Sequence, residues 1–545
     1  LSSRWKRYAF YAFVLLLLGG SLSLFYTRAV VVKMLPYDNK SELEIVLDMP
    51  EGTTLEETLR VAREIGEFVS RQNLVTDYQI YVGTPAPFNF NGLVRHYYLR
   101  KAPHFAEIQV NLIDKHDRKE QSHQFAKMIR DQIREIAFRN GAKYVAVVEV
   151  PPGPPVLSPL VAEVYAPERD LQKEVALRIL DVFRESPSVT DEGIYLESPM
   201  PLLTFRIDEE KVRLNGFTRE EVTRTVEALV AGLQVGIIQS TDTEHVPIKI
   251  RLAEGYRLPD TLKTLKLVNR EGRKVPLSEL VHVVEGTAPE TIYHKNLRRV
   301  IYVVGDVAGR EEAPFYGILS VRDRVLNMNT PYGGVGELWM SLPLLEDRVY
   351  VKWDGEMHIT LEVFRDLGLA FGVALFVMYV LILAWFRSFR VPGIIMAPIP
   401  LTLVGIVPGH WLMDQITGNV FFTATSMIGF IALAGIIVRN SILLVDFAEE
   451  RLREGLPVHM AVVEAGVIRT RPILLTAVAV VIGAFVILFD PIFNGLAISL
   501  IFGTLGSTAL TLVLIPLMYY ASKVKGLPPE SCPTPEEIKR DLMAD

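Results

Sequence analysis

Six apolar runs constrain the fold of this chain more than any other feature of its sequence. Each is long enough to cross the hydrocarbon core of a bilayer, which takes about 20 residues in a helix. One lies near the start and five lie in the last third, in the order Tyr8–Tyr26, Leu367–Trp385, Val391–Leu412, Phe422–Phe447, Pro472–Phe489 and Gly495–Tyr519. The sequence therefore predicts a membrane α-helical bundle of six spans. A block of about 340 residues without any such run separates the first span from the second.

The basic residues fall in alternate loops of this six-span arrangement. They are Arg4, Lys6, Arg7, Arg387, Arg390, Arg451, Arg453, Arg469, Arg471, Lys523 and Lys525. The other two loops, around His410–Asn419 and Asp490–Asn494, carry no Lys or Arg. Because an excess of Lys and Arg marks cytoplasmic loops, the C-terminus is predicted in the cytoplasm and the long block outside it. A basic start before an apolar run also describes a signal peptide, but no small-residue cleavage site follows, which favours an anchor.

The long block alternates strand-like and helix-like segments. Segments between Ser41 and Val150 follow the order β-α-β-β-α-β of a ferredoxin-like unit, and a similar unit restarts after a Pro-rich break, with Leu203–Ile207 as one of its strands. The fold class expected is thus six spans plus a large α+β region, with an insertion inside the second unit. The predicted boundaries are 1–30 for the first span, 31–155 for the first unit, 156–207 and 289–360 for the second, 208–288 for the insertion, 361–522 for five spans and 523–545 for a tail.

The fourth span contains the polar residues with the strongest functional implication. Arg439 and Asn440 interrupt an apolar segment that ends near Asp446. A charged group at bilayer depth is costly, so it normally faces a partner or an aqueous path. The alternative is that Arg439 extends to the cytoplasmic surface, since it lies about 10 Å of helical rise before Asp446.

Two further places in the sequence suggest candidate residues. The fifth span carries Thr476, with Arg469 just before it, and its Pro472 is predicted in the first helical turn. A lone Thr in such a helix usually bonds back to its own carbonyls. In the block outside the membrane, Phe88 and Phe90 lie on a loop rich in Pro and Asn, where aromatic rings either pack on the unit beneath or line an apolar ligand pocket.

Several functional classes find no support in the sequence. No phosphate loop, dinucleotide fingerprint, HExxH or G-x-S-x-G motif is present, so the chain is not expected to be an enzyme and an ion gradient would supply energy. A net charge of −6 gives no reason to expect nucleic acid as a partner. The one cysteine, Cys532, cannot form a disulfide within the chain.

The segments LPYDNKSELEIVLDMPEGTTLEET, GIIVRNSILLVDFAEE and RTRPILLTAV resemble the resistance–nodulation–division transporters, and the likeness extends to about residue 520. The resemblance implies the second half of a twelve-span, proton-driven export pump of the bacterial inner membrane. Such pumps are homotrimers that work with a periplasmic adaptor and an outer-membrane channel. The two ferredoxin-like units would be porter subdomains, and 208–288 the docking subdomain.

The resemblance also implies roles for single residues. Arg439 falls where multidrug members usually have a lysine of the proton relay, followed by Asn440, while Thr476 and Arg469 match relay positions of the next span. Phe88 and Phe90 resemble the aromatic loop between the drug pockets. The relay aspartates belong to a first half that this chain lacks, so a fragment or one product of a split gene is expected. Because Arg439 cannot release a proton itself, it would pair with those aspartates.

The distribution of methionines bears on the class of substrate. The methionines of the long block are scattered, whereas export of a soft metal ion predicts a methionine cluster, so amphiphilic organic compounds and the multidrug branch are favoured over heavy-metal cations. A non-pumping protein-export accessory of the same superfamily is the alternative from a different class. It would have a smaller block outside the membrane.

Overall fold

The computed structural model describes residues 4–151, 153, 155–239, 245–253, 256, 260, 264–307, 309, 311–418 and 420–524. Most of the predicted tail, with Cys532, lies outside these residues. The chain divides into two compact units. The larger unit comprises Leu1–Leu196 and Ile292–Asp545, and the smaller is the inserted unit Glu197–Thr291.

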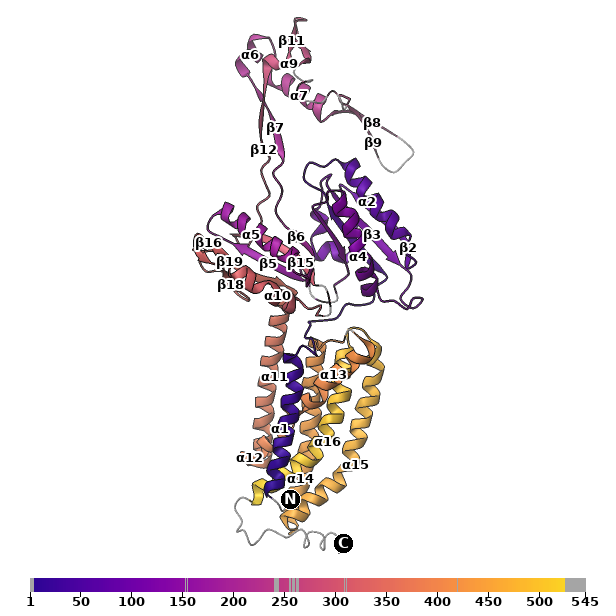
Figure 1. Cartoon of the computed structure of the whole chain (residues 1–545), viewed down its shortest axis with the longest axis vertical. Helices are drawn as coiled ribbons and strands as arrows, with labels where there is room; N and C mark the ends of the chain where they lie inside the picture. Colours follow the sequence, from indigo (N-terminus) through magenta and orange to yellow (C-terminus); the bar gives the residue numbers. More distant parts are fainter. Residues whose placement is uncertain are drawn as a thin grey trace. The chain divides into compact units, whose positions relative to one another are not determined.

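Six helices in the described part of the chain are long and apolar enough to span a membrane, as the sequence predicts. They run side by side in one bundle (Figure 1). Their elements are α1 (Arg4–Tyr26), α11 (Glu356–Phe386), α12 (Arg390–Met396) with η3 (Pro400–Thr402) and α13 (Leu403–Thr417), α14 (Ala424–Arg453), α15 (Val458–Phe485) with η4 (Val486–Phe489), and α16 (Asn494–Val524). The placement of Pro472 in a first turn is wrong, because α15 begins at Val458 and continues through it.

Helix α16 packs against α13, α14 and α15, and small residues bring the helices close. A Cβ added to Gly405 of α13 would lie 2.2 Å from the Phe502 carbonyl oxygen of α16. A Cβ on Gly429 of α14 would lie 2.7 Å from the Ser499 side chain. Small residues that allow such approach are the usual means of packing helices in a membrane, where apolar side chains have no preference for protein over lipid.

The first α/β unit has the predicted order of elements. It contains β1 (Glu42–Asp48), α2 (Leu55–Ser70), β2 (Val75–Val82), the short α3 (Phe90–Val94) and η1 (Tyr97–Leu99), β3 (Phe105–Leu112), α4 (Ser122–Arg139) and β4 (Tyr144–Val148). The sheet order is β2-β3-β1-β4, with every pair antiparallel. Alternate residues of β1, such as Ile45, face the helices, where Ile65 of α2 and Ile129 of α4 complete an apolar core. Thr54 caps α2 by accepting a hydrogen bond from Glu57 N at 3.3 Å.

The second α/β unit has a five-stranded sheet in the order β18-β19-β5-β15-β6. Its elements are β5 (Leu160–Tyr165), α5 (Arg169–Arg184), β6 (Val189–Ile194), β15 (Ile301–Val307), α10 (Pro314–Leu326), β18 (Gly336–Leu338) and β19 (Tyr350–Gly355), with the short pairs β13 (His294–Lys295)/β14 (Arg298–Arg299) and β16 (Asn329–Thr330)/β17 (Gly333–Gly334). Phe183 and Trp353 lie in a core separate from that of the first unit.

The inserted unit corrects one strand assignment. The predicted strand Leu203–Ile207 does not complete the second α/β unit, because β7 (Pro201–Ile207) pairs along its whole length with β12 (Val281–Thr287). Each strand finds its hydrogen-bond partners in the other, which forms a two-stranded ribbon. The other elements are α6 (Glu209–Leu214), α7 (Arg219–Val230), β8 (Leu233–Ile238), β9 (Val246–Ile250), β10 (Lys266–Val268), β11 (Lys274–Pro276) and α9 (Leu277–Leu280). Val222 and Leu280 lie in its small core.

Candidate functional site in the membrane helices

Arg439 lies midway along α14. The helix has 30 residues, so Arg439 is about 22 Å of helical rise from either end. The charged end of α14 nevertheless begins at Asp446, about 10 Å of helical rise after Arg439, the distance on which the alternative of a guanidinium at the cytoplasmic surface is based. A permanent positive charge thus lies within the apolar part of the helix, where it normally faces a partner or an aqueous path.

The side chain of Arg439 belongs to an exposed stripe on α14. Residues three or four positions apart share one helix face, and the exposed residues of α14 follow that spacing through the membrane: Ile428, Ala432, Gly435, Arg439, Leu443 and Asp446. Among the described residues, none forms a hydrogen bond or ion pair with the Arg439 side chain. A Cβ added to Gly435 would meet nothing within 4 Å. This stripe, the α14 face, has small residues and one positive charge, Arg439, that suit a second helix bearing an anionic group.

Of the other predicted relay residues, Asn440 follows Arg439 on α14, whereas Arg469 and Thr476 lie on α15. Asn440 is buried, with 7% of its surface exposed. The Thr476 hydroxyl donates to the Ile473 carbonyl at 2.8 Å, so it bonds within its own helix. The Arg469 guanidinium lies 5.1 Å from the centroid of the Phe447 ring. Within the described part of the chain, the four residues do not form a connected network.

Phe88 and Phe90 are both exposed, with 76% and 48% of their surfaces accessible. Their loop is nevertheless anchored to the sheet. The Ala86 backbone N–H donates to Glu107 at 2.7 Å, and the Asn89 amide donates to Gln109 at 3.1 Å. The two rings are therefore held on an ordered loop and remain free to contact a ligand.

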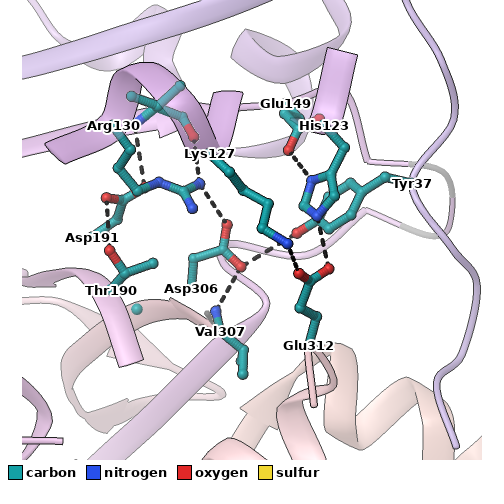
Figure 2. Close-up of polar contacts among 12 residues, drawn as sticks. Tyr37, His123, Lys127, Arg130, Glu149, Thr190, Asp191, Asp306, Val307 and Glu312 are labelled. Atoms are coloured by element: carbon teal, nitrogen blue, oxygen red, sulfur yellow. Dashed lines mark hydrogen bonds and ion pairs between the residues drawn. The ribbon is translucent and has the colours of Figure 1, made fainter. Parts of the chain in front are cut away.

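A buried ionic seam, which sequence reasoning missed, joins the two α/β units (Figure 2). Helix α4 carries basic residues at spacings of four, three and four, which places them on one face: His123, Lys127, Arg130 and Arg134. Their acidic partners in the second unit are Glu312, Asp306, Asp191 and Glu192. The basic spacing was visible in the sequence, but the acidic residues are scattered over more than a hundred positions.

His123 lies between two carboxylates at the end of the seam that is nearer the start of α4. Its Nδ1 lies 2.6 Å from Glu149 Oε2 and its Nε2 lies 2.7 Å from Glu312 Oε2. Burial lowers the pKa of His123, but hydrogen bonds to the two carboxylates raise it more, to about 9. Burial raises the pKa of Glu312, but His123 and Lys127 lower it to about 2. The pair is therefore ionised at neutral pH.

Arg130 occupies the second half of the seam. Its Nε lies 3.2 Å from Asp191 Oδ2, and Nη2 lies 3.7 Å from Asp306 Oδ2. Burial raises the pKa of Asp191 to about 6 despite the neighbouring Arg130.

No group of three or more His, Cys, Asp or Glu among the described residues could hold a metal ion.

Comparison with known proteins places the chain in a family. The model of the AcrB/AcrD/AcrF family matches residues 4–523. Similar proteins include the swarming motility protein SwrC of Bacillus subtilis (strain 168), 25% identical over 65% of this chain and 32% of its own length. The cobalt-zinc-cadmium resistance protein CzcA of Cupriavidus metallidurans is 26% identical over 67% and 33%, and the multidrug resistance protein MdtC of Proteus mirabilis is 24% identical over 62% and 31%.

The fold has a match among solved structures. A crystal structure of a heavy metal efflux pump superposes with a TM-score of 0.76 at 21% identity, covering 94% of this chain and 50% of that one. This chain thus spans about a third to a half of the length of the proteins that it matches. From the matched region and its six spans, the chain belongs to the AcrB/AcrD/AcrF family of resistance–nodulation–division transporters.

Proposed function

We propose that this chain supplies half of a proton-driven export pump of the inner membrane and that Arg439 is its fixed relay charge. The observation that carries the proposal is the α14 face, where the guanidinium of Arg439, within the apolar part of the helix, has no partner among the described residues. An isolated charge at that depth is unstable, so a carboxylate from another polypeptide or segment would complete the site.

The coupling follows from the permanent charge of arginine. Since an arginine side chain keeps its charge, the proton would bind to the carboxylates facing Arg439. While they are ionised, attraction in a medium of low dielectric holds the two helices together, and protonation removes most of that attraction. The helices then shift, and the α/β units change their relative positions. Asn440, Thr476 and Arg469 remain proposed members of the relay, which would act only in the completed bundle.

The proposed substrates are amphiphilic organic compounds. The exposed rings of Phe88 and Phe90 suit an apolar ligand, and one relative is named a multidrug resistance protein. Heavy-metal cations are the second candidate, because several relatives are named for cobalt, zinc, cadmium or nickel resistance. A site at which methionine thioethers bind a soft metal ion is not favoured, because Met49 and Met328 lie in the separate cores of the two α/β units.

The proposed assembly is a homotrimer with the missing half, a periplasmic adaptor and an outer-membrane channel. In that assembly 31–155, 156–207 and 289–360 would form porter subdomains, 208–288 the docking subdomain, and the tail would lie in the cytoplasm. A protein-export accessory is the competing function. Co-purification separates the two, since a pump should retain the adaptor and channel, and an accessory should retain a translocation channel.

Replacement of Arg439 tests the relay. In cells that express the whole transporter, Arg439→Ala should abolish resistance to dyes, detergents or metal salts, because the carboxylates lose their counter-charge. Arg439→Lys should retain part of it. The control is Arg453→Ala at the end of the same helix, which removes an exposed charge near Glu449 and should leave resistance unchanged. Full resistance in Arg439→Ala, with the normal amount of transporter in the membrane, would refute the relay role. Which of the dyes, detergents and metal salts the parent confers resistance to identifies the substrate class.

A further inference from the structure

The two α/β units meet through charges and not through a shared apolar core. Each unit has its own buried core, and none of the apolar residues of one core belongs to the other. Between them lies the ionic seam, in which cations of α4 face anions of β6, of the end of β15 and of the segment before α10 (Figure 2). Apart from the ring of Tyr144, which packs against Gly193, the contact between the two cores is largely polar, which is typical of domains that move relative to one another.

The geometry at His123 requires a protonated ring. A carboxylate that carries its charge only accepts hydrogen bonds, and the Glu149 and Glu312 oxygens lie within 2.7 Å of the two ring nitrogens. Only an imidazolium donates from both nitrogens. Both carboxylates are buried, with 6% and 4% of their side chains exposed, so the contact is closed to solvent.

Only one of these two contacts crosses the seam. Glu149 follows β4 and belongs to the first unit with His123, whereas Glu312 precedes α10 in the second unit. Lys127, one helical turn from His123, forms an ion pair with the same Glu312. The ring also stacks on Tyr37, with centroids 4.4 Å apart, and the Tyr37 hydroxyl donates to Asp306 of the second unit at 3.3 Å.

The segment after α1 connects this contact to the membrane helices. The Lys33 ammonium lies over the ring of Tyr37, 4.2 Å from the ring centroid, in a cation–π contact. The Lys33 backbone N–H donates to the Phe422 carbonyl, just before α14, at 3.1 Å. Arg439 lies on that same helix. Lys33 and Tyr37, four positions apart in the segment after α1, therefore connect the start of α14 with the seam.

We propose that His123, clamped between Glu149 and Glu312, is a latch that holds the two α/β units together and must open when they separate. His123 is a positioning residue here, since it acts on the relative placement of the units. The inference rests on the proposed function only in that export requires the units to move. The groups that face the ring are Tyr37, Glu149, Glu312 and Lys127.

Thiol labelling of the seam in membranes tests the latch. The only native cysteine, Cys532, is replaced by Ser, and Thr190→Cys places a reporter at the seam, where the threonine is 9% exposed beside Arg134. The labelling rate is normalised at each pH to that of Ser70→Cys, an exposed site. His123→Gln should raise the normalised rate at pH 7.5 about tenfold, the effect of losing one charge-assisted contact.

Two glutamate variants provide the sharper comparison. Glu312→Gln removes the carboxylate across the seam and should raise the rate as His123→Gln does. Glu149→Gln removes an equally buried carboxylate on the same unit as His123. At pH 6, where the ring keeps its proton, it should leave the rate close to that of the parent, and it should lower the pH at which the rate rises, because Glu149 helps to raise the pKa of His123. His116→Gln, an exposed histidine outside the seam, is the neutral control.

The pH profile gives the readout that a purely structural role would not change. The parent's normalised rate should rise as the pH passes about 9, where the ring loses its proton, and His123→Gln should abolish that rise. Equal rates in the parent, His123→Gln and Glu312→Gln would overturn the latch, as would equal release by Glu149→Gln and Glu312→Gln at pH 6. Since labelling requires neither substrate nor export, loss of resistance in Arg439→Ala and behaviour of the seam are judged separately.

Discussion

At the scale of single residues, the first α/β unit contains buried ionised groups of opposite energetic effect. His123 is stabilised as a cation by two carboxylates, whereas Glu44 is a carboxyl group whose charged form is disfavoured by burial and by the nearby Glu107. Glu44 is 1% exposed, and neither of its oxygens accepts a hydrogen bond within 3.5 Å. Burial raises the pKa of Glu44 to about 7, the charge of Glu107 adds to this, and Asn89, Arg100 and Arg95 oppose it.

Glu44 therefore predicts a stability that falls as pH rises. A carboxyl whose pKa is higher in the folded state binds its proton more tightly there, so stability is lost between about pH 4.5 and pH 7. Glu44→Gln removes the charge and should stabilise the protein at pH 8 by about 2–3 kcal/mol. Thermal unfolding of detergent-purified parent and variant at pH 8 and pH 4 measures this. A gain that persists at pH 4 would contradict the cause given.

At the scale of elements, close contacts between glycines and neighbouring backbones determine how the membrane helices pack. Gly405 and Gly409 of α13 both face Phe502 of α16. In α11, by contrast, an added Cβ at Gly372 would meet nothing within 4 Å. The same residue type is thus a packing requirement on one helix and replaceable on another.

This contrast predicts opposite effects of one substitution. Gly405→Ala places a methyl group against the Phe502 carbonyl and should destabilise the bundle by about 1–3 kcal/mol, because the two helices must move apart. Gly372→Ala should be neutral or slightly stabilising, since alanine favours helix by roughly 1 kcal/mol. The melting temperatures of the two variants in detergent, compared with the parent, measure the difference. Equal shifts would show that the α13–α16 contact does not limit stability.

At the scale of the whole molecule, the α14 face is the surface at which a second transporter half is proposed to pack against this chain. It combines Ala432 and Gly435, which permit close approach of a helix, with Arg439, which requires an opposite charge. The seam acts at the same scale, because it connects units with separate cores. The completed transporter would use both surfaces, one for proton binding and one for movement of the α/β units.

Gly435→Leu tests the α14 face without touching Arg439. The new side chain has open space in this chain, so membrane insertion and stability should remain normal. It should nevertheless block the approach of a second helix and abolish export, with loss of co-purification of the other half. Gly372→Leu on α11 is the matched control and should retain export. Normal export in Gly435→Leu would show that no helix packs closely at this face.

The sequence by itself determined the six spans, the order of elements in the first α/β unit and the presence of a charge deep in the fourth span. These depend on local patterns: a run of apolar residues, a period of two or 3.6, and a polar residue that interrupts the run. The ends of helices were less predictable. The apolar run begins near Pro472, but α15 already begins at Val458, because the more polar residues between them are also helical.

Tertiary structure alone decided the remaining features. It paired β7 with β12 across the inserted unit, exposed Arg439 and buried Asn440, and brought Glu312 to His123 from 189 positions away. Local periodicity carries no information about which distant segment meets a given face. The α4 spacing showed that a basic stripe exists, but only the folded chain shows that the other α/β unit supplies its anions and that two glutamates keep His123 charged.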